Sequence, residues 1–326
     1  MVQELKHIAL KLLLGLAVLM GLGVIYQSFQ LEQDLAVHAP FDPAIEAAIA
    51  ADVVYLGDCS DTYCAAGEEG TSITQYLQAQ LPEAKVAGIS ANGFHSGIYL
   101  QLLEALAART DTTSKKVIVT LNLRSFAPHI YYDYFYSPTI YQQLLLSDPD
   151  YSPFVNRLRL TFNPHKSAVR QELEELAREA ESVPLFEENS NLQQPSPTEW
   201  KKRIDVDAIA ATYINDLAVE INHSNPRLQD LESIAALAKA KNWELWFHLI
   251  PLNHEQANQL VGSELQGIAE QNLGFLSNYF GGSNMHFIDN TKLLPATGFM
   301  HEESGSHFYA GAKKEMARSI VEHLER

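Results

Sequence analysis

The chain has 326 residues, of which 46% are hydrophobic and 19% are charged, and its formal net charge is −17. This composition supports a buried core and excludes a disordered chain. The acidic charge disfavours nucleic acid as a partner because a phosphate backbone is repelled. Two cysteines, Cys59 and Cys64, are too few for a disulfide scaffold or a zinc ribbon.

The N-terminal segment has the pattern of a membrane anchor. Lys6 and Lys11 accompany an apolar stretch over residues 8–29, and a bilayer-spanning helix needs about 20 residues. We interpret residues 1–30 as a transmembrane anchor rather than a cleaved signal peptide, because no small-residue cleavage site follows. A buried helix is the remaining alternative. The lysines place the N-terminus in the cytoplasm, which predicts a single-pass protein of the cell membrane with its bulk extracytoplasmic.

Residues 31–50 follow as a predicted stalk with a short helix, and residues 51–326 form the main domain. Apolar runs that end at turn residues predict parallel strands, and segments of helical periodicity lie between them. The predicted strands cover 52–58, 84–90, 115–123, 243–253 and 284–290. The predicted helices cover 71–81, 95–109, 225–242, 255–280 and 311–326. This alternation predicts a three-layer α/β/α fold with one parallel sheet.

The alternation is interrupted at about 127–224, which we interpret as a mostly helical insertion over the carboxyl edge of the sheet. It begins with a tyrosine-rich piece containing Tyr131, Tyr132, Tyr134 and Tyr136. These aromatic side chains suit either packing of the insertion or stacking on carbohydrate. A loop rich in Pro, Ser and Asn covers residues 187–198.

Gly57-Asp58-Cys59-Ser60 ends the first predicted strand. A nucleophile at such a position is exposed at the sheet edge, with backbone N–H groups available to an oxyanion. An ordinary turn explains the same residues, since Gly and Asp are common in turns.

A second candidate feature is His307, which precedes the last helix and follows a polar loop with Glu302 and Glu303. A metal site formed by His301, Glu302 and His307 is an alternative, but the spacing fits no familiar metal motif. The sequence therefore predicts neither a metal nor a cofactor.

Three segments together resemble the SGNH (GDSL-like) hydrolase superfamily: "LGDCSD", "GISANGFHSG" and "ESGSHFYAGA". Within it the chain is similar to the membrane-anchored extracytoplasmic type, which includes D-alanyl transfer and alginate O-acetylation proteins. The resemblance covers about 50–126 and 225–326. It implies a flavodoxin-like layering and acyl transfer through a nucleophile and a histidine.

Carried over residue by residue, the resemblance makes Cys59 the nucleophile, where the family has serine, with Ser60 as the alternative. His307 would be the base, and Glu303 or a backbone carbonyl would orient it, because Ser304 stands where the family has its acid. A thiolate is a stronger nucleophile than a serine hydroxyl. We therefore expect an imidazolium and the following helix to lower the pKa of the Cys59 thiol below about 8.5.

The oxyanion hole implied by the resemblance consists of Cys59, Ser90 and Asn122, with Ser125 as the alternative to Asn122 in a shifted register. Ser90 stands where the family has glycine, and Gly93 follows three residues later. Arg124, just after Asn122, suits either a carboxylate ligand or an ion pair that holds a loop.

These features predict an acyl esterase or O-acyltransferase acting on cell-envelope or exported polysaccharide. Its partners would be an acylated carbohydrate or polymer and a membrane-bound acyl-donor protein. The alternative is a catalytically inactive SGNH-like domain that binds polymer or a partner in an export complex. A disulfide between Cys59 and Cys64 would favour that alternative.

Overall fold

The computed structural model describes residues 2–29, 42–127, 154–155, 158, 209–281, 285–300 and 307–325, apart from positions 66, 67, 69, 92 and 111–114. Most of the predicted insertion, its tyrosine cluster and the loop 187–198 lie outside these residues. So do His301, Glu302, Glu303 and Ser304. At the end of the insertion, residues 209–217 are helical.

The sheet has five parallel strands in the order β2-β1-β3-β4-β5, which confirms the predicted parallel α/β architecture. The strands are β1 (Val53–Gly57), β2 (Val86–Ser90), β3 (Lys116–Leu121), β4 (Glu244–Leu249) and β5 (Met285–Asp289). β1 and β3 are buried along almost their whole length, as expected for strands that are covered on both faces.

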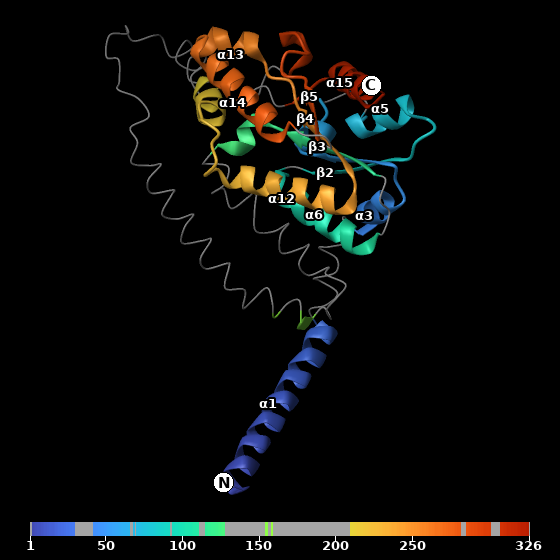
Figure 1. Ribbon diagram of the computed structural model, residues 1–326, viewed down its shortest axis with the longest axis vertical. Coiled ribbons are helices and arrows are strands. Elements are labelled where there is room, and N and C mark those ends of the chain that lie inside the picture. Colours follow the sequence, from blue (N-terminus) through green and yellow to red (C-terminus); the bar gives the residue numbers. More distant parts are fainter. Residues whose placement is uncertain are drawn as a thin grey trace, which may run out of the picture.

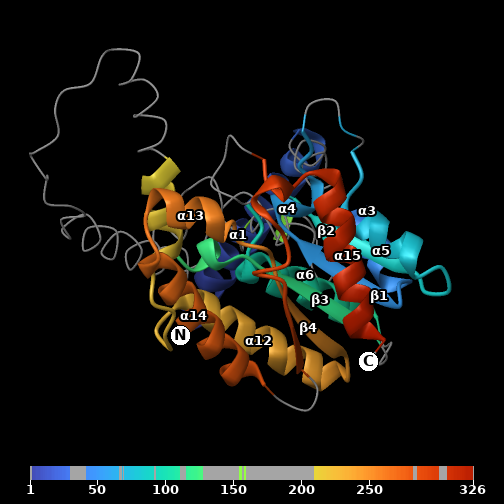
Figure 2. The same ribbon diagram turned by 90° about the horizontal axis from the view of Figure 1, so that it is seen from above.

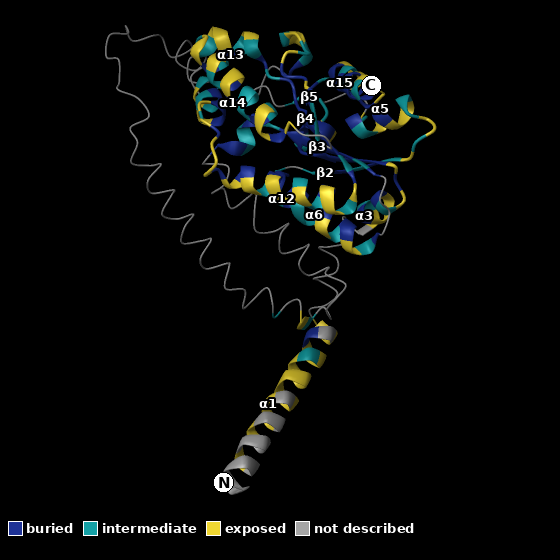
Figure 3. Ribbon diagram, viewed as in Figure 1, coloured by how far each residue is buried: buried dark blue, intermediate teal, exposed yellow. Residues whose placement is uncertain are grey.

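Helices cover both faces of this sheet (Figures 1 and 2). The described helices of the main domain are α3 (Asp42–Ile49), α4 (Cys59–Thr62), α5 (Ile73–Gln80), α6 (Ser96–Arg109), α12 (Pro226–Lys241), α13 (His254–Leu260), α14 (Glu264–Phe280) and α15 (Ala310–Leu324). One apolar core joins the sheet to α3, α6, α12 and α14, and a second joins it to α5 and α15. Figure 3 shows the buried residues concentrated in the strands and on the inward sides of these helices.

Local sequence explains most helix ends. Ser72 accepts the Gln75 N–H while the Gln75 side chain accepts the Ser72 N–H, a capping box that starts α5. The single helix expected over 255–280 is wrong, because the chain breaks into α13 and α14. Gly262 lies between them with φ of +101°, a conformation that side-chain-bearing residues rarely adopt.

The N-terminal segment is helical over α1 (Val2–Phe29). No helix in the described part of the chain combines the length and the apolar character that a bilayer crossing requires. The transmembrane anchor therefore stays a prediction from the sequence.

Lys115 is a buried lysine whose side chain reaches the C-terminal end of α3. Its side chain is 1% exposed, and its Nζ donates to the carbonyls of Ala48, Ile49 and Ala51 at 3.0, 2.8 and 2.6 Å. A cation at this place satisfies carbonyls that have no partner within the helix and complements the helix dipole. Lys115→Met should lower the free energy of unfolding by about 3 kcal/mol, measured by urea denaturation, because these carbonyls lose a charged donor.

The matched control is Lys292→Met, which removes a lysine whose side chain is 63% exposed and which pairs with Glu270. An exposed ion pair contributes about 0.5 kcal/mol or less. Equal unfolding midpoints for the two variants would contradict a stabilising role of Lys115.

Candidate functional site

The strand order reverses at β1, since the chain passes to β2 on one side and then returns to β3 on the other. Ligands of open α/β sheets bind at such a point, outside the carboxyl ends of the strands. Cys59 follows the end of β1 and Asn122 follows the end of β3. The fold thus places two of the predicted site residues on either side of the switch point.

Asp58 joins these two loops. It is the N-cap of α4, and its Oδ1 accepts the Ser60 N–H at 2.8 Å. Its Oδ2 accepts from Nδ2 of Asn122 at 3.2 Å, while Oδ1 of Asn122 accepts the Arg124 N–H at 3.2 Å. The loop after β1 is therefore hydrogen-bonded to the loop after β3 through side chains.

Cys59 is the first residue of α4, and backbone N–H groups of Gly93 and of Cys59 itself approach its sulfur. Burial, followed by the charge of Asp58, raises the pKa of this thiol to about 12, against which Arg124 and the two N–H groups act in part. The lowered thiol pKa expected from the sequence is therefore wrong. Cys59 is a neutral thiol at neutral pH, which needs a base before it can attack.

The sequence offers Ser90 and, three residues later, Gly93 at the position where the family has glycine. The φ of Gly93 is +77°, which favours glycine, and hydrogen bonding from its backbone acts to lower the pKa of the Cys59 thiol. Ser90 instead ends β2 with its side chain against β1, since a Cβ at Gly57 would lie 2.6 Å from the Ser90 Oγ. The backbone of Gly93 therefore affects the Cys59 thiol, and Ser90 as an oxyanion donor stays a prediction.

Ser60 does not compete with Cys59 for the site. Its side chain is 1% exposed, and its Oγ has no hydrogen-bond partner among the residues described. Cys59, in contrast, is partly exposed. Adjacent side chains of this turn thus point apart, and the thiol is the one nearer to solvent.

His307 lies at the same turn, where its ring stacks on that of Tyr63. The two rings stack with centroids 4.1 Å apart and an interplanar angle of 13°. Tyr63 is the C-cap of α4, and its N–H donates to the Cys59 carbonyl at 2.8 Å. Glu303, the acid predicted to orient His307, lies outside the described residues. Sequence reasoning missed Tyr63, since nothing in its surroundings signals a stacking partner 244 positions away.

Lys313 connects α15, the last helix, to this turn by a hydrogen bond. It is 1% exposed, its Nζ donates to the Tyr63 carbonyl, and Nζ lies 3.6 Å from Sγ of Cys64. Nearby Asp61 accepts the Thr74 N–H at 3.2 Å. Burial raises the pKa of Asp61, while the neighbouring Ser90 hydroxyl, the Thr74 N–H and the Lys313 charge lower it. These contacts hold α15, and hence the residue that stacks on Tyr63, at the end of β1.

Arg124 has one of the two roles that the sequence left open, that of an ion pair. Its Nε lies 3.8 Å from Oδ2 of Asp216, so it forms an ion pair with the helical segment 209–217. Its charge also lowers the pKa of the Cys59 thiol, which places it within electrostatic reach of the sulfur.

Both cysteines are free thiols, so the bridge considered as an alternative is absent from this structure. Within the described ranges, no cluster of three or more His, Cys, Asp or Glu side chains could hold a metal ion. Two members of the alternative metal site, His301 and Glu302, are not described.

No family model and no curated protein matches the chain. Among solved structures it is similar to a lipase/acylhydrolase from Enterococcus faecalis, with 11% identity, a TM-score of 0.38, and coverage of 84% of this chain and 95% of that chain. It is also similar to phospholipase A1 from Streptomyces albidoflavus, with 10% identity, a TM-score of 0.42 and coverage of 84% and 98%. A GDSL-like lipase from Bacteroides thetaiotaomicron shows 10% identity, a TM-score of 0.37 and coverage of 88% and 97%.

Proposed function

We propose that the chain is an ester hydrolase or acyltransferase of the SGNH type with Cys59 as its nucleophile. One observation carries the proposal: a thiol follows the end of the central strand β1, and backbone hydrogen bonding from Cys59 and Gly93 acts to lower its pKa. Asn122 is tied to the same turn through Asp58. Donors clustered around a nucleophile are what an oxyanion requires.

In the proposed reaction, His307 takes the Cys59 proton as sulfur attacks the acyl carbon of an ester. The carbonyl oxygen becomes an oxyanion held by the N–H groups of Cys59 and Gly93 and by the N–H of Asn122 Nδ2 that is not donated to Asp58. The ester C–O bond then breaks, the alcohol leaves with the proton from His307, and a thioester remains on Cys59. Water or an acceptor hydroxyl, deprotonated by His307, attacks the thioester and releases the thiol.

We further propose an acylated carbohydrate or exported polymer as the substrate and a membrane-bound protein as the acyl donor. The resemblance in the three sequence segments supports this, as does the pattern of lysines and apolar residues over 1–30. The same pattern supports membrane attachment with the bulk of the chain extracytoplasmic.

A specific observation favours a second candidate, a catalytically inactive domain that binds polymer or a partner. The pKa of the Cys59 thiol, about 12, leaves almost no thiolate at neutral pH. A catalytic cysteine has a lowered pKa or an adjacent base that removes its proton. The two candidates therefore differ in whether His307 can deprotonate Cys59.

The deciding experiment incubates the purified full chain with short-chain acyl esters, and follows both alcohol release and the mass of the peptide that contains Cys59. The enzyme predicts turnover together with a transient acyl adduct on that peptide. Absence of both, from pH 6 to pH 9 and on acetylated polysaccharide as well as small esters, would favour the inactive domain.

A further inference from the structure

The N-terminal end of α12 contacts Ser96 of α6 and Phe126, which lie three and four residues after the proposed oxyanion donors. We propose that its residues Asn225, Arg227 and Asp230, named here the α12 bracket, set the separation between the N–H of Gly93 and Nδ2 of Asn122. This inference rests on the proposed function. It assigns positioning residues to a helix that lies far from Cys59 in sequence.

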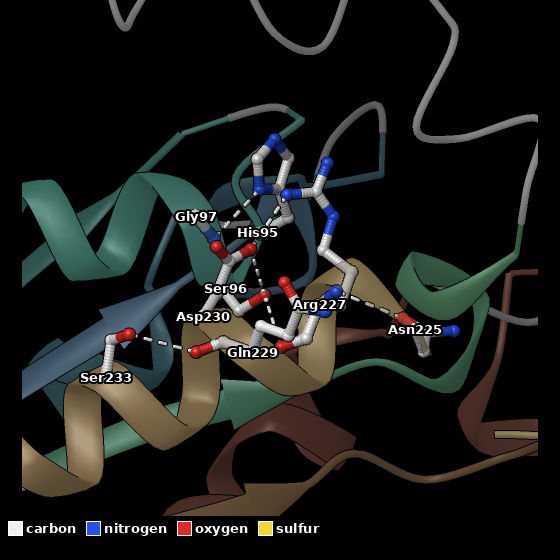
Figure 4. Close-up of polar contacts among 8 residues, drawn as sticks. All are labelled: His95, Ser96, Gly97, Asn225, Arg227, Gln229, Asp230 and Ser233. Carbon is white, nitrogen blue, oxygen red and sulfur yellow. Dashed lines mark hydrogen bonds and ion pairs between the residues drawn. The ribbon is translucent and has the colours of Figure 1, made fainter. Parts of the chain in front are cut away.

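One arm of the bracket holds the loop after β2. Ser96, the first residue of α6, is 4% exposed, and its Oγ lies 3.2 Å from the Arg227 carbonyl and 3.1 Å from Oδ2 of Asp230. Nη1 of Arg227 lies 3.0 Å from the same Oδ2, so the carboxylate is fixed from two sides. Figure 4 shows these side chains converging between the two helices.

The two helices approach each other closely at this point. A Cβ at Gly97 would lie 2.9 Å from Nη1 of Arg227 and 3.0 Å from Oδ2 of Asp230. Nδ1 of His95, the N-cap of α6, accepts the Gly97 N–H at 3.1 Å. His95 stands only two residues after Gly93, so a clamp on the first turn of α6 restrains the direction of the Gly93 N–H.

The other arm of the bracket holds the loop after β3. Nδ2 of Asn225 donates to the carbonyl of Phe126 at 3.1 Å, and its Oδ1 caps α12 by accepting the Arg227 N–H at 3.0 Å. Phe126 ends η1 (Leu123–Phe126), the 3-10 turn that starts directly after Asn122. One side chain therefore fixes the start of α12 and the end of the turn that carries the second donor.

Burial gives the bracket its rigidity. Arg227 is 8% exposed, and burial raises the pKa of Asp230 while the guanidinium of Arg227 lowers it. Displacing either group would cost much free energy, because a buried charge without its partner is strongly unfavourable. A displacement of about 1 Å in a donor can reduce catalysis as much as about 100-fold, so such rigidity has a catalytic use.

The test compares Ser96→Ala and Asn225→Ser with the control Ser233→Ala. Ser is a good N-cap, so Asn225→Ser retains the cap of α12 but is too short to reach Phe126. Ser233 is on the same helix, and its exposed hydroxyl contacts only the Gln229 carbonyl in Figure 4. We expect both bracket variants to lower kcat on a small acyl ester about tenfold with KM changed less than about twofold, and the control to keep both.

A second readout, the alkylation rate of Cys59 at pH 9, separates positioning from damage to the fold. Because the Gly93 N–H lowers the thiol pKa, its displacement in Ser96→Ala should slow alkylation about threefold. Partial unfolding would expose the thiol and speed alkylation instead. Unchanged or faster alkylation of Ser96→Ala, or an unchanged kcat in both bracket variants, would overturn the inference.

The alkylation readout does not depend on ester turnover. If the native chain turns over no ester, the proposed enzyme fails, but slower alkylation of Ser96→Ala relative to Ser233→Ala still supports the bracket. If the chain is active and Ser96→Ala is alkylated at the native rate, the enzyme stands and the bracket fails.

Discussion

Cys59→Ala should abolish turnover of a small acyl ester, with a loss of about 1,000-fold or more in kcat, because the proposed reaction passes through a thioester on this sulfur. The substitution removes one sulfur atom from a partly exposed position and keeps the helix start that Asp58 caps. Steady-state kinetics on the full chain measure the loss, and circular dichroism shows whether the fold is kept.

Two neighbouring substitutions make this prediction specific. Cys59→Ser should retain measurable activity, because a hydroxyl takes the same place beside the N–H groups of Gly93 and Cys59. Ser60→Ala should keep native activity, since the Ser60 side chain is buried and directed away from solvent. Native activity in Cys59→Ala combined with a loss in Ser60→Ala would move the nucleophile by one residue.

The sheet could be predicted from sequence because its signals are local. The β-branched run over 115–123 and the apolar run before Gly57 are typical of strands covered on both faces, and both became strands. The break at Gly262 was missed, because one glycine inside a periodic pattern indicates a helix end only when its left-handed φ is known.

The site was harder to predict because it depends on directions and on burial. The sequence places Ser90 and Gly93 close together, but the left-handed φ of +77° at Gly93 and its effect on the pKa of the Cys59 thiol follow only from the structure. The α12 bracket joins Ser96 to Asp230, 134 positions away, so no local pattern reveals it. The prediction of a lowered thiol pKa was wrong for the same reason, because burial is the largest cause of the shift in the pKa of Cys59.

Cys59 should react with iodoacetamide about 1,000-fold more slowly at pH 7.5 in the folded chain than in the same chain unfolded in urea. The folded pKa is about 12 against an ordinary 9.0, and each of these roughly three units lowers the thiolate fraction about tenfold. Labelling should rise about tenfold per pH unit from 7 to 10 without levelling off near 9. Mass spectrometry of the separate Cys59 and Cys64 peptides measures each rate.

The causes of the raised pKa suggest two substitutions that should change the labelling rate of Cys59 in opposite directions. Burial is the larger cause and Asp58 the next, while Arg124 acts against them. Asp58→Asn keeps a residue that can cap α4 but removes the negative charge, so it should speed labelling of Cys59 at pH 8. Arg124→Met should slow it. Equal shifts in both variants, or labelling of the native chain as fast as in urea, would contradict this electrostatic account. If the account holds, the folded thiol reaches its nucleophilic form only when a base removes the proton, and ester turnover then depends on His307 rather than on a standing thiolate.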